Sequence, residues 1–417
     1  MRYFIAAMLI ISGCAFIFDL CFSLYLTFSQ HIKQEKYPRF QRKFNTLLLL
    51  IPAMNEYSTL KRDMLGLLTL HDKCKDFIDL KLVFIDDASS DGTTELLDEW
   101  SQSNPKNLYI IHRVKPNAQQ GKGPALQDAI NHLLKMNFPV KQTLVGIIDA
   151  DSHFDSNYLH QVVNTFENSN YDLVQTRVDV YNTVDNLTIM QNFELSVYNG
   201  LLQMARTNWG TALASGNGQF VTLTMAEKVG WSSSLLEDCE FSLKGLLRGY
   251  YGTFLNTVAI RQEGITNLGK LIRQRTRWCQ GGLQCLKIYG GKIIKSDRMS
   301  AGVKAFILLF LLVPYISVIV VPSSIVSVIT LIAYARFNLG ASLAIILTLL
   351  LTEYTINGLM IKKQWFETGF STVNNPIEIL RIIFSFGVYR WLLSFIPYRS
   401  IGRELIGNNS WTKTSHT

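Results

Sequence analysis

The sequence contains few charged residues, few prolines and few cysteines, and each scarcity excludes a class of protein. Charged residues make up 17% of the 417 residues, a proportion too low for an intrinsically disordered chain. The ten prolines are too few for a collagen-like or proline-rich linker protein. The six cysteines form no CxxC pair and no zinc-ligand spacing, so we expect reduced thiols instead of a disulfide framework or a metal site.

Basic residues outnumber acidic ones by 40 to 32, which gives a formal net charge of +8. Such an excess fits a nucleic acid, an anionic membrane or a phosphorylated small molecule equally well. No helix-turn-helix, zinc or RNA-binding signature occurs in the sequence, so we expect no nucleic-acid partner. The positions of the charges and of the apolar residues must decide between the other two classes.

The apolar residues, 48% of the chain, gather into segments near its two ends. Residues 3–28 contain Asp19 as the only charged side chain, and the run is long enough to cross a bilayer. Basic residues between Lys33 and Lys43 follow it, which predicts a cytoplasmic flank and an N-terminus outside. A cleaved signal peptide and a lipoprotein cleavage site at Cys14 are the alternatives, but the apolar run continues well past that cysteine.

Two further apolar runs, 304–335 and 339–361, are each long enough to span a membrane. Lys362 and Lys363 then mark a second cytoplasmic flank. Residues 377–397 are apolar but interrupted by charges, so they either cross once more or lie in the interface. The predicted organisation is an anchor at 1–28, a basic juxtamembrane segment at 29–45, a cytoplasmic domain at 46–300, transmembrane or interfacial helices at 301–397 and a tail at 398–417.

The domain at 46–300 has the composition of a soluble protein and alternates between strand-like and helix-like patterns. This alternation predicts a parallel, doubly wound sheet, which binds ligands beyond the carboxyl ends of its strands. Neither a GxGxxG turn nor a GxxxxGK[ST] loop occurs, which argues against a dinucleotide site and a P-loop. The predicted strands are 46–52, 80–85, 108–112 and 143–148, and the predicted helices are 59–70, 93–101 and 123–136.

Acidic residues follow two of the predicted strands. Asp149 and Asp151 come just after the fourth strand, and carboxylates at that spacing can hold Mg²⁺ or Mn²⁺ against a diphosphate. The alternative is a pair of solvated loop carboxylates. Asp87 follows the second strand, where it either accepts a hydrogen bond from a nucleobase or ribose or caps the helix that begins near Thr93.

Two loops before predicted helices carry further charged candidates. Lys122 stands between two glycines, so its cation is suited to a phosphate or a base, and the alternative is an ordinary surface turn. Glu237 and Asp238 follow an apolar stretch. One of these carboxylates could take a proton from an attacking hydroxyl, and the alternative is a helix start that carries two acids.

The segment from Gln274 to Trp278 is the most specific motif. In a helix, Gln274, Arg277 and Trp278 lie at i, i+3 and i+4 and share one face. Arg277 offers a bidentate cation to phosphate, and Trp278 offers a flat platform to a sugar ring. The alternative is a basic amphipathic helix on anionic lipid. The two are compatible, since Arg273 and Arg275 point to other faces of the helix.

Together and in this order, the motifs resemble those of the processive inverting glycosyltransferases of family 2, over residues 46–284. That family includes hyaluronan, cellulose, chitin-oligosaccharide and poly-N-acetylglucosamine synthases. Residues 277–282 are similar to the RWxQGG sequence of the poly-N-acetylglucosamine synthases. The resemblance implies a glycosyltransferase-A-type, Rossmann-like and mostly parallel α/β domain inserted between transmembrane helices. The matching segments are 52–56, 86–89, 121–123, 149–151, 237–238 and 274–278.

The resemblance also implies a role for each candidate residue. Family members usually carry a small-residue acceptor loop followed by a basic residue, whereas here Val221 and Thr222 follow residues 215–220. The resemblance implies that Asp238 is the general base, beside Glu237, that Asp87 contacts the uridine with Lys122 in its neighbourhood, and that Asp149 and Asp151 bind the diphosphate and metal. It further implies that Gly216, Asn217 and Gln219 line the acceptor site. Gln274, Arg277 and Trp278 would bind the pyrophosphate and the glycan.

The implied activity is polymerisation of a UDP-sugar into an extracellular or capsular polysaccharide by a multi-pass protein of the cell membrane. Mg²⁺ or Mn²⁺ would be the cofactor, and the donor, the growing glycan and membrane lipids would be the partners. An enzyme that adds one sugar to a lipid or glycan is the alternative. A scaffold with a degenerate transferase domain is disfavoured because the acidic motifs are intact. The sugar, the linkage, accessory subunits and the oligomeric state are left open.

Overall fold

The apolar runs of the central domain form a seven-stranded sheet in the computed structural model, which describes residues 2–29, 41–368 and 376–410. The four predicted strands lie side by side and parallel, with β1 between β2 and β4. Their bounds agree with the prediction to within one residue at each end. These strands are β1 (Thr46–Ala53), β2 (Asp79–Asp86), β3 (Leu108–His112) and β4 (Thr143–Ile147).

The second half of the sheet introduces one antiparallel strand. β6 (Gln219–Thr222) pairs antiparallel with both β4 and β5 (Leu173–Val180), and β7 (Gly252–Gln262) is parallel to β5. The strand order is β3-β2-β1-β4-β6-β5-β7. The prediction of a mostly parallel α/β sheet is confirmed, whereas the antiparallel strand was not predicted because its four residues are too short a pattern to recognise.

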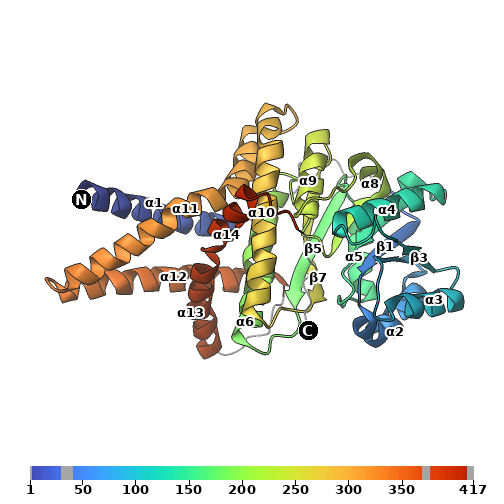
Figure 1. Ribbon diagram of the computed structural model, residues 1–417, viewed down its shortest axis with the longest axis horizontal. Coiled ribbons are helices and arrows are strands. Elements are labelled where there is room, and N and C mark those ends of the chain that lie inside the picture. The colour runs from blue at the N-terminus through green and yellow to red at the C-terminus, as the bar shows by residue number, and fades with distance from the viewer. Residues whose placement is uncertain (1, 30–40, 369–375, 411–417) are drawn as a thin grey trace.

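Helices cover both faces of this sheet (Figure 1). One apolar core includes Phe84, Tyr158 and Phe220, and the other includes Val145 and Phe241. The alternate side chains of buried strands feed both cores, which explains why these strands are apolar throughout. The helices on the first face are α2 (Tyr57–Cys74), α3 (Thr93–Ser103) and α5 (Ser156–Glu167), and those on the second are α4 (Lys122–Lys135), α8 (Leu223–Val229) and α9 (Glu237–Arg248), with a short η2 (Val140–Gln142) before β4.

A helical insertion between β5 and β6 connects the sheet to the apolar helices. It consists of α6 (Asn186–Asn192), the π-helical segment η3 (Phe193–Tyr198) and α7 (Asn199–Thr207). Asp185 caps its start by accepting a hydrogen bond from the Thr188 amide at 2.7 Å. Its apolar face shares a core with residues of the N-terminal and C-terminal helices. The insertion therefore packs the seven-stranded sheet against the apolar helices.

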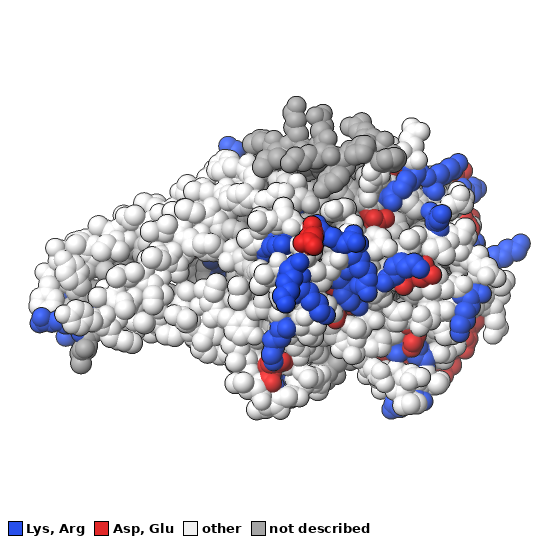
Figure 2. All heavy atoms as spheres, turned by 90° about the horizontal axis from the view of Figure 1, so that it is seen from above, with Lys and Arg blue, Asp and Glu red and all other residues white. Residues whose placement is uncertain are grey.

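Three apolar helices project from the domain side by side (Figure 1). They are α1 (Arg2–Phe28), α11 (Ala301–Ala335) and α12 (Leu339–Thr368), and α11 follows α10 (Leu268–Lys295). The visible face of this projection is almost without charge, and Lys and Arg gather beside its base (Figure 2). By length and composition, four helices of the described chain can cross a membrane: Arg2–Phe28, Ala301–Ala335, Leu339–Gln364 and Ile379–Leu405.

The segment after α12 folds back onto the domain. α13 (Pro376–Leu393) runs across the direction of the projecting helices, and α14 (Ile396–Leu405) continues to α10 (Figure 1). Helical structure thus extends beyond residue 397, where we placed the start of the tail. Of the basic segment at 29–45, residues 30–40 lie outside the described residues, and Arg42 forms an ion pair with Asp172 at 3.3 Å.

Candidate active site

The Lys122 side chain joins several of the predicted motifs. Lys122 begins α4, and its Nζ lies 2.5 Å from Asp149 Oδ1 and 2.9 Å from the Gly216 carbonyl oxygen. Burial lowers the pKa of this ammonium, but the negative charges of Asp149, Glu237 and Asp238 outweigh burial and hold the pKa above its usual value. Lys122 therefore stays positively charged at the centre of an acidic cluster.

Gly216 brings the 215–218 loop into contact with the Glu237–Asp238 pair. Its φ of +81° is a left-handed conformation that favours glycine, and a Cβ there would lie 3.2 Å from Asp238 Oδ2 and 3.8 Å from Lys122 Nζ. The loop, the lysine and the candidate base therefore share one small volume. Sequence spacing alone could not show this, because these residues come from three separate segments of the chain.

Asp238 has the most perturbed carboxyl group of the site. Burial and the neighbouring Glu237 raise its pKa to about 7, although the Cys239 amide and the cations Lys122 and Arg277 act in the opposite direction. Its Oδ1 accepts a hydrogen bond from the Cys239 amide at 2.7 Å. Such a carboxyl group exchanges a proton near neutral pH, as a general base requires. Arg277 influences it because α10 passes close to the start of α9.

Two glycines permit this close approach of helices. A Cβ on Gly123 would lie 1.9 Å from the Ser232 carbonyl oxygen and 3.1 Å from Glu237 Cβ. A Cβ on Gly281 would lie 2.5 Å from Leu236 Cβ and 2.7 Å from the Leu236 amide nitrogen. The start of α9 is thus held between α4 and α10, and each contact leaves no space for a side chain.

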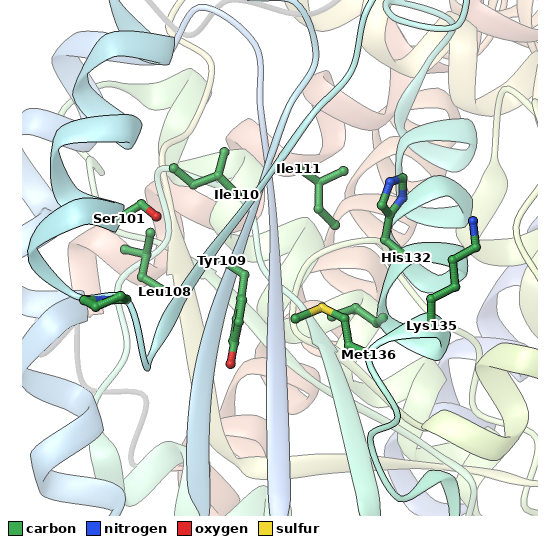
Figure 3. Close-up of a pocket in the computed structure, with 10 residues that line it drawn as sticks. Ser101, Leu108, Tyr109, Ile110, Ile111, His132, Lys135 and Met136 are labelled. Atoms are coloured by element: carbon green, nitrogen blue, oxygen red, sulfur yellow. The ribbon is translucent and has the colours of Figure 1, made fainter.

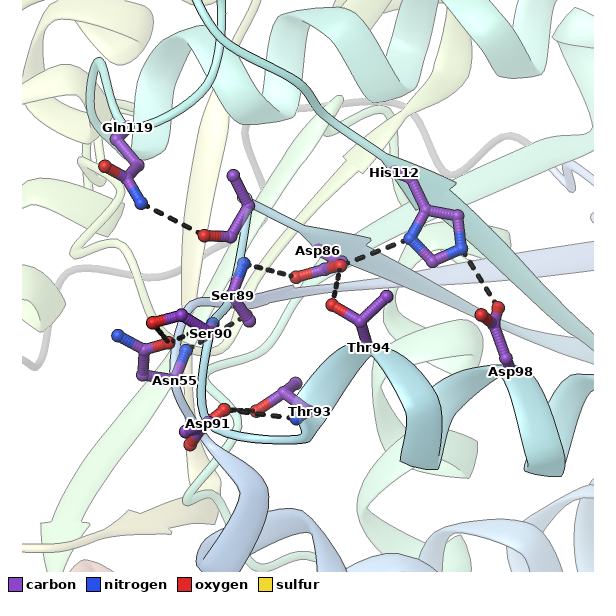
Figure 4. Close-up of polar contacts among 11 residues, drawn as sticks. Asn55, Asp86, Ser89, Ser90, Asp91, Thr93, Thr94, Asp98, His112 and Gln119 are labelled. Carbon is purple, nitrogen blue, oxygen red and sulfur yellow. Dashed lines mark hydrogen bonds and ion pairs between the residues drawn. The ribbon is translucent and has the colours of Figure 1, made fainter.

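The loop that follows β2, to which Asp87 belongs, is held by hydrogen bonds that Asp86 accepts from the Ser89 amide and the Thr94 hydroxyl (Figure 4). Asp87 Oδ1 forms an ion pair with Arg113 and accepts a hydrogen bond from the Gln119 amide at 2.9 Å. Gly92 is the N-cap residue of α3, and Asp91, one residue before it, accepts a hydrogen bond from the Thr93 amide at 3.1 Å. Asp87 is therefore not the helix cap, and its carboxylate is fixed in orientation at the carboxyl end of β2.

Asp149 and Asp151 follow β4 but face different neighbours. Asp149 pairs with Lys122, whereas Asp151 Oδ2 accepts a hydrogen bond from the Glu263 amide at 3.1 Å. Within the described residues, no three His, Cys, Asp or Glu side chains converge as a ready metal site. The Asp149 side chain is 40% exposed, and carboxylate oxygens are ligands that Mg²⁺ and Mn²⁺ accept, so the pair fits a metal that is also bound by a diphosphate.

Two of the predicted acceptor-loop residues point into the protein. Asn217 is buried, and its Oδ1 accepts hydrogen bonds from the Asp149 amide at 3.2 Å and from the Ser152 hydroxyl at 3.1 Å. Gln219 is fully buried within β6. Asn217 therefore supports Asp149 from behind, and Gln219 lies in the interior of the sheet, away from the surface of the site.

The Gln274–Trp278 motif is helical and occupies the first half of α10. Its Gln, Arg and Trp side chains differ in burial. Gln274, Arg277 and Trp278 are each partly exposed. Arg275 is buried, its guanidinium carbon lies 4.2 Å from the centre of the Trp278 ring, and one nitrogen lies 2.7 Å from Glu194 Oε2. Arg275 therefore faces the protein, which excludes it from contact with lipid.

The sequence analysis missed several residues that shape this site. These residues are Arg113, Arg275 and Gly281. Arg113 lies outside every motif recognised in the sequence. Arg275 and Gly281 lie within motifs, but at positions to which no role was assigned. Arg113 follows β3 directly, and a basic residue at the carboxyl end of a parallel strand is a signal that could have indicated it. The other two depend on contacts across the fold.

A separate hollow of about 490 Å³ lies at the open edge of β3 (Figure 3). Tyr109, His132, Lys135 and Met136 are among the side chains that line it. None of the predicted site residues belongs to this lining, so the hollow is distinct from the cluster around Lys122.

The fold and its grouped motifs define a glycosyltransferase-A-type domain flanked by candidate membrane helices. The chain belongs to glycosyl transferase family group 2, whose model it matches over residues 144–356, and it also matches the glycosyl transferase family 2 model over residues 49–230. The resemblance inferred from the motifs is confirmed at the level of the family.

Similar proteins include a beta-monoglucosyldiacylglycerol synthase of Synechocystis sp., which is 28% identical over 48% of this chain and 40% of that protein. A poly-beta-1,6-N-acetyl-D-glucosamine synthase of Staphylococcus aureus is 25% identical over 58% of this chain and 55% of that protein. This chain thus spans about half the length of these relatives. A mannosyltransferase of Pyrobaculum calidifontis, solved with GDP-Man and Mn²⁺, shares the fold with a TM-score of 0.61, 18% identity and coverage of 88% of this chain and 100% of that chain.

The two adjacent glycines of α10 provide a matched test of the helix contact. A Cβ on Gly281 would meet Leu236, whereas a Cβ on Gly282 would meet nothing within 4 Å. We expect Gly281→Ala to destabilise the protein by about 1–3 kcal/mol through overpacking and to lower transfer activity by displacing Asp238. Gly282→Ala should be neutral or slightly stabilising. Thermal unfolding and initial rates check this, and equal behaviour of the two variants would contradict it.

The raised pKa of Asp238 predicts a pH dependence. A base acts when deprotonated, so the rate should rise as the pH passes through about 7, the pKa of Asp238. Glu237→Gln removes the negative neighbour that raises this pKa, so the rising limb should move to lower pH. Initial rates of nucleotide release across the neutral range measure the limb. A limb that stays in place or moves to higher pH would show that another group titrates.

Proposed function

We propose that this protein is a membrane-embedded inverting glycosyltransferase that polymerises a UDP-sugar into a β-linked glycan. The observation that supports the proposal best is the Asp238 carboxyl group, which has a pKa of about 7 beside the cations Lys122 and Arg277. The carboxylate provides a base, and the cations provide positive charge for a diphosphate leaving group.

In the proposed reaction, Asp238 accepts the proton of an acceptor hydroxyl group. The hydroxyl oxygen attacks the anomeric carbon as the bond from this carbon to the β-phosphate oxygen breaks, and the electron pair leaves with UDP. Attack from the face opposite the leaving group converts an α-linked donor into a β-linked product. Asp238 then releases its proton to solvent, which its pKa permits near neutral pH.

The remaining motif residues would hold the donor. Asp149 and Asp151 would bind Mg²⁺ or Mn²⁺ with the diphosphate, and this metal would neutralise the charge that develops on the leaving group. When the donor binds, the Lys122 ammonium would turn partly from the Asp149 carboxylate toward the phosphate oxygens. Asp87, fixed by Arg113, would accept a hydrogen bond from the uridine.

Trp278 supports a glycan as the acceptor. Its ring is partly exposed on the same helix as Arg277, and an aromatic face near the base suits a sugar ring already joined to the chain. The alternative is the addition of one sugar to a lipid or glycan. It is supported by similarity to a protein named for glucosyldiacylglycerol synthesis, whereas polymerisation is supported by similarity to a protein named for poly-N-acetylglucosamine synthesis.

We further propose that α1, α11 and α12 span the membrane and that the domain faces the cytoplasm. Near the end of α12, Gln364 donates a hydrogen bond to the Ser196 carbonyl oxygen at 2.8 Å, and after α14 the Asn408 carbonyl oxygen accepts one from Gln280 at 2.9 Å. Both flanks of α13 therefore contact the catalytic domain. A single crossing by α13 would separate these flanks, so we place α13 in the interface.

Transfer activity tests the central proposal. Membranes containing the protein are incubated with UDP-glucose, UDP-galactose, UDP-N-acetylglucosamine or GDP-mannose, each with Mg²⁺ or Mn²⁺. We expect turnover of a UDP-sugar and a ladder of products, and a kcat lowered by about 10²–10⁴-fold in Asp238→Asn with donor binding retained. An unchanged rate in Asp238→Asn would contradict the mechanism, and a single product would favour the alternative acceptor.

Protease accessibility tests the proposed topology. Tags are fused before Met1 and after Thr417, and protease is added to intact spheroplasts. In intact spheroplasts we expect the protease to remove only the N-terminal tag, because an odd number of helices separates it from the domain. The C-terminal tag should be removed only after permeabilisation. Protection of both tags, or cleavage of both in intact cells, would contradict the arrangement.

A further inference from the structure

The segment that follows the membrane helices holds α10 on both sides of Trp278. The first contact lies before the tryptophan. Glu194 Oε2, in η3, accepts hydrogen bonds from Arg275 at 2.7 Å and from the Tyr389 hydroxyl of α13 at 2.6 Å. The same Arg275 lies over the Trp278 ring. The orientation of the Trp278 ring thus depends, through Arg275 and Glu194, on α13.

The second contact lies after the tryptophan and centres on Gln280. This side chain is fully buried. Its Oε1 accepts a hydrogen bond from Arg403 Nε at 3.0 Å, and its Nε2 donates to the Asn408 carbonyl oxygen at 2.9 Å and to Asn409 Oδ1 at 3.2 Å. The amide is therefore satisfied by α14 and the residues that follow it, and a side chain without an amide would lose all of these bonds to α10.

Further bonds run along the same side of α10. The Ser400 hydroxyl donates to the Thr276 carbonyl oxygen at 3.1 Å, and Gln284 and Lys287 contact Glu404 at 2.9 Å and 2.7 Å. The contacts with Thr276, Gln280, Gln284 and Lys287 recur at every third or fourth residue, which is one face of a helix. α14 therefore packs along α10 for several turns.

This face is connected to the candidate base through one helical turn. Gly281, next to Gln280, packs closely against Leu236, and Leu236 directly precedes Glu237 and Asp238. A shift of α10 toward or away from α14 would therefore move the Arg277–Trp278 face relative to Asp238. Displacements of about 1 Å can lower rates by about a hundredfold.

We propose that residues 376–410 form a clamp that sets the position of the acceptor-binding face of α10 relative to Asp238. Arg275 and Gln280 are positioning residues in this clamp: they act through Trp278 and the helix and do not touch the substrate. The inference rests on the proposed function, since it assigns the Trp278 face to the acceptor. It makes α13 and α14 part of the acceptor site and not merely an attachment to the membrane.

The test compares three variants of the full-length protein in membranes. Gln280→Met keeps the length of the side chain but removes its amide, and Tyr389→Phe removes only the hydroxyl that contacts Glu194. Tyr109→Phe is the control, because its hydroxyl donates to the Lys106 carbonyl oxygen at 3.5 Å at the open edge of β3, outside the clamp and away from the cluster around Lys122. The donors are the UDP-sugars of the panel above, and the probe acceptors are chito-oligosaccharides, cello-oligosaccharides and dioleoylglycerol vesicles.

We expect Gln280→Met to raise the KM for the acceptor about tenfold or more, and Tyr389→Phe to raise it severalfold. Hydrolysis of the donor without acceptor should fall by a smaller factor than the acceptor-dependent rate, because a shift of α10 moves Arg277 but leaves Lys122, Asp149 and Asp151 in place. Tyr109→Phe should match the wild type in both the acceptor KM and the donor hydrolysis rate. An unchanged acceptor KM in Gln280→Met and Tyr389→Phe, or an equal loss of donor hydrolysis, would overturn the proposal.

Hydrogen exchange separates failure of the clamp from failure of the proposed function. In Gln280→Met, amides of α10 around residues 274–284 should exchange at least about tenfold faster, whereas those of β1 and β4 should be unchanged. Wild-type protein without any transfer activity would refute the proposed function. Unchanged exchange in α10 would refute the clamp, whatever the activity. If Gln280→Met does not fold, Tyr389→Phe provides the same comparison.

Discussion

The site depends on one partly buried cation among carboxylates. Lys122 contacts Asp149 and the Gly216 carbonyl oxygen, and it lies within electrostatic reach of Glu237 and Asp238. Without this ammonium, several negative groups would repel one another at the carboxyl end of the sheet. The same cation limits how far burial raises the pKa of Asp238. One interaction thus links Asp149, the 215–218 loop and the Glu237–Asp238 pair, and it limits the pKa of Asp238.

Close packing transmits this arrangement to the rest of the protein. Gly123 and Gly281 let α4 and α10 contact the start of α9 from two sides. α10 is in turn bonded to η3, α13 and α14 through Glu194 and Gln280. The catalytic face is consequently built from segments on both sides of the projecting helices α11 and α12.

The sequence predicts the strands well because buried parallel strands are apolar along their whole length. It also predicts which residues carry charge at the strand ends, such as Asp87 and Asp149. It does not predict that Gln219 is buried, because the β6 pattern is too short. The sequence does not reveal the partner of Asp87 either, since Arg113 follows β3 and reaches Asp87 at the end of the neighbouring strand β2. The contacts of Arg275 and Gln280 involve helices that follow the candidate membrane helices, and local sequence patterns cannot reveal such contacts.

The most direct test is an experimental structure of the protein in lipid with UDP and Mn²⁺. The account predicts the uracil beside Asp87 and Arg113, the metal between Asp149, Asp151 and the diphosphate, and Lys122 turned toward phosphate. It also predicts an open space between Asp238 and Trp278, where an acceptor can lie. A nucleotide bound elsewhere, such as in the hollow beside β3, or a diphosphate out of reach of Lys122, would contradict the account.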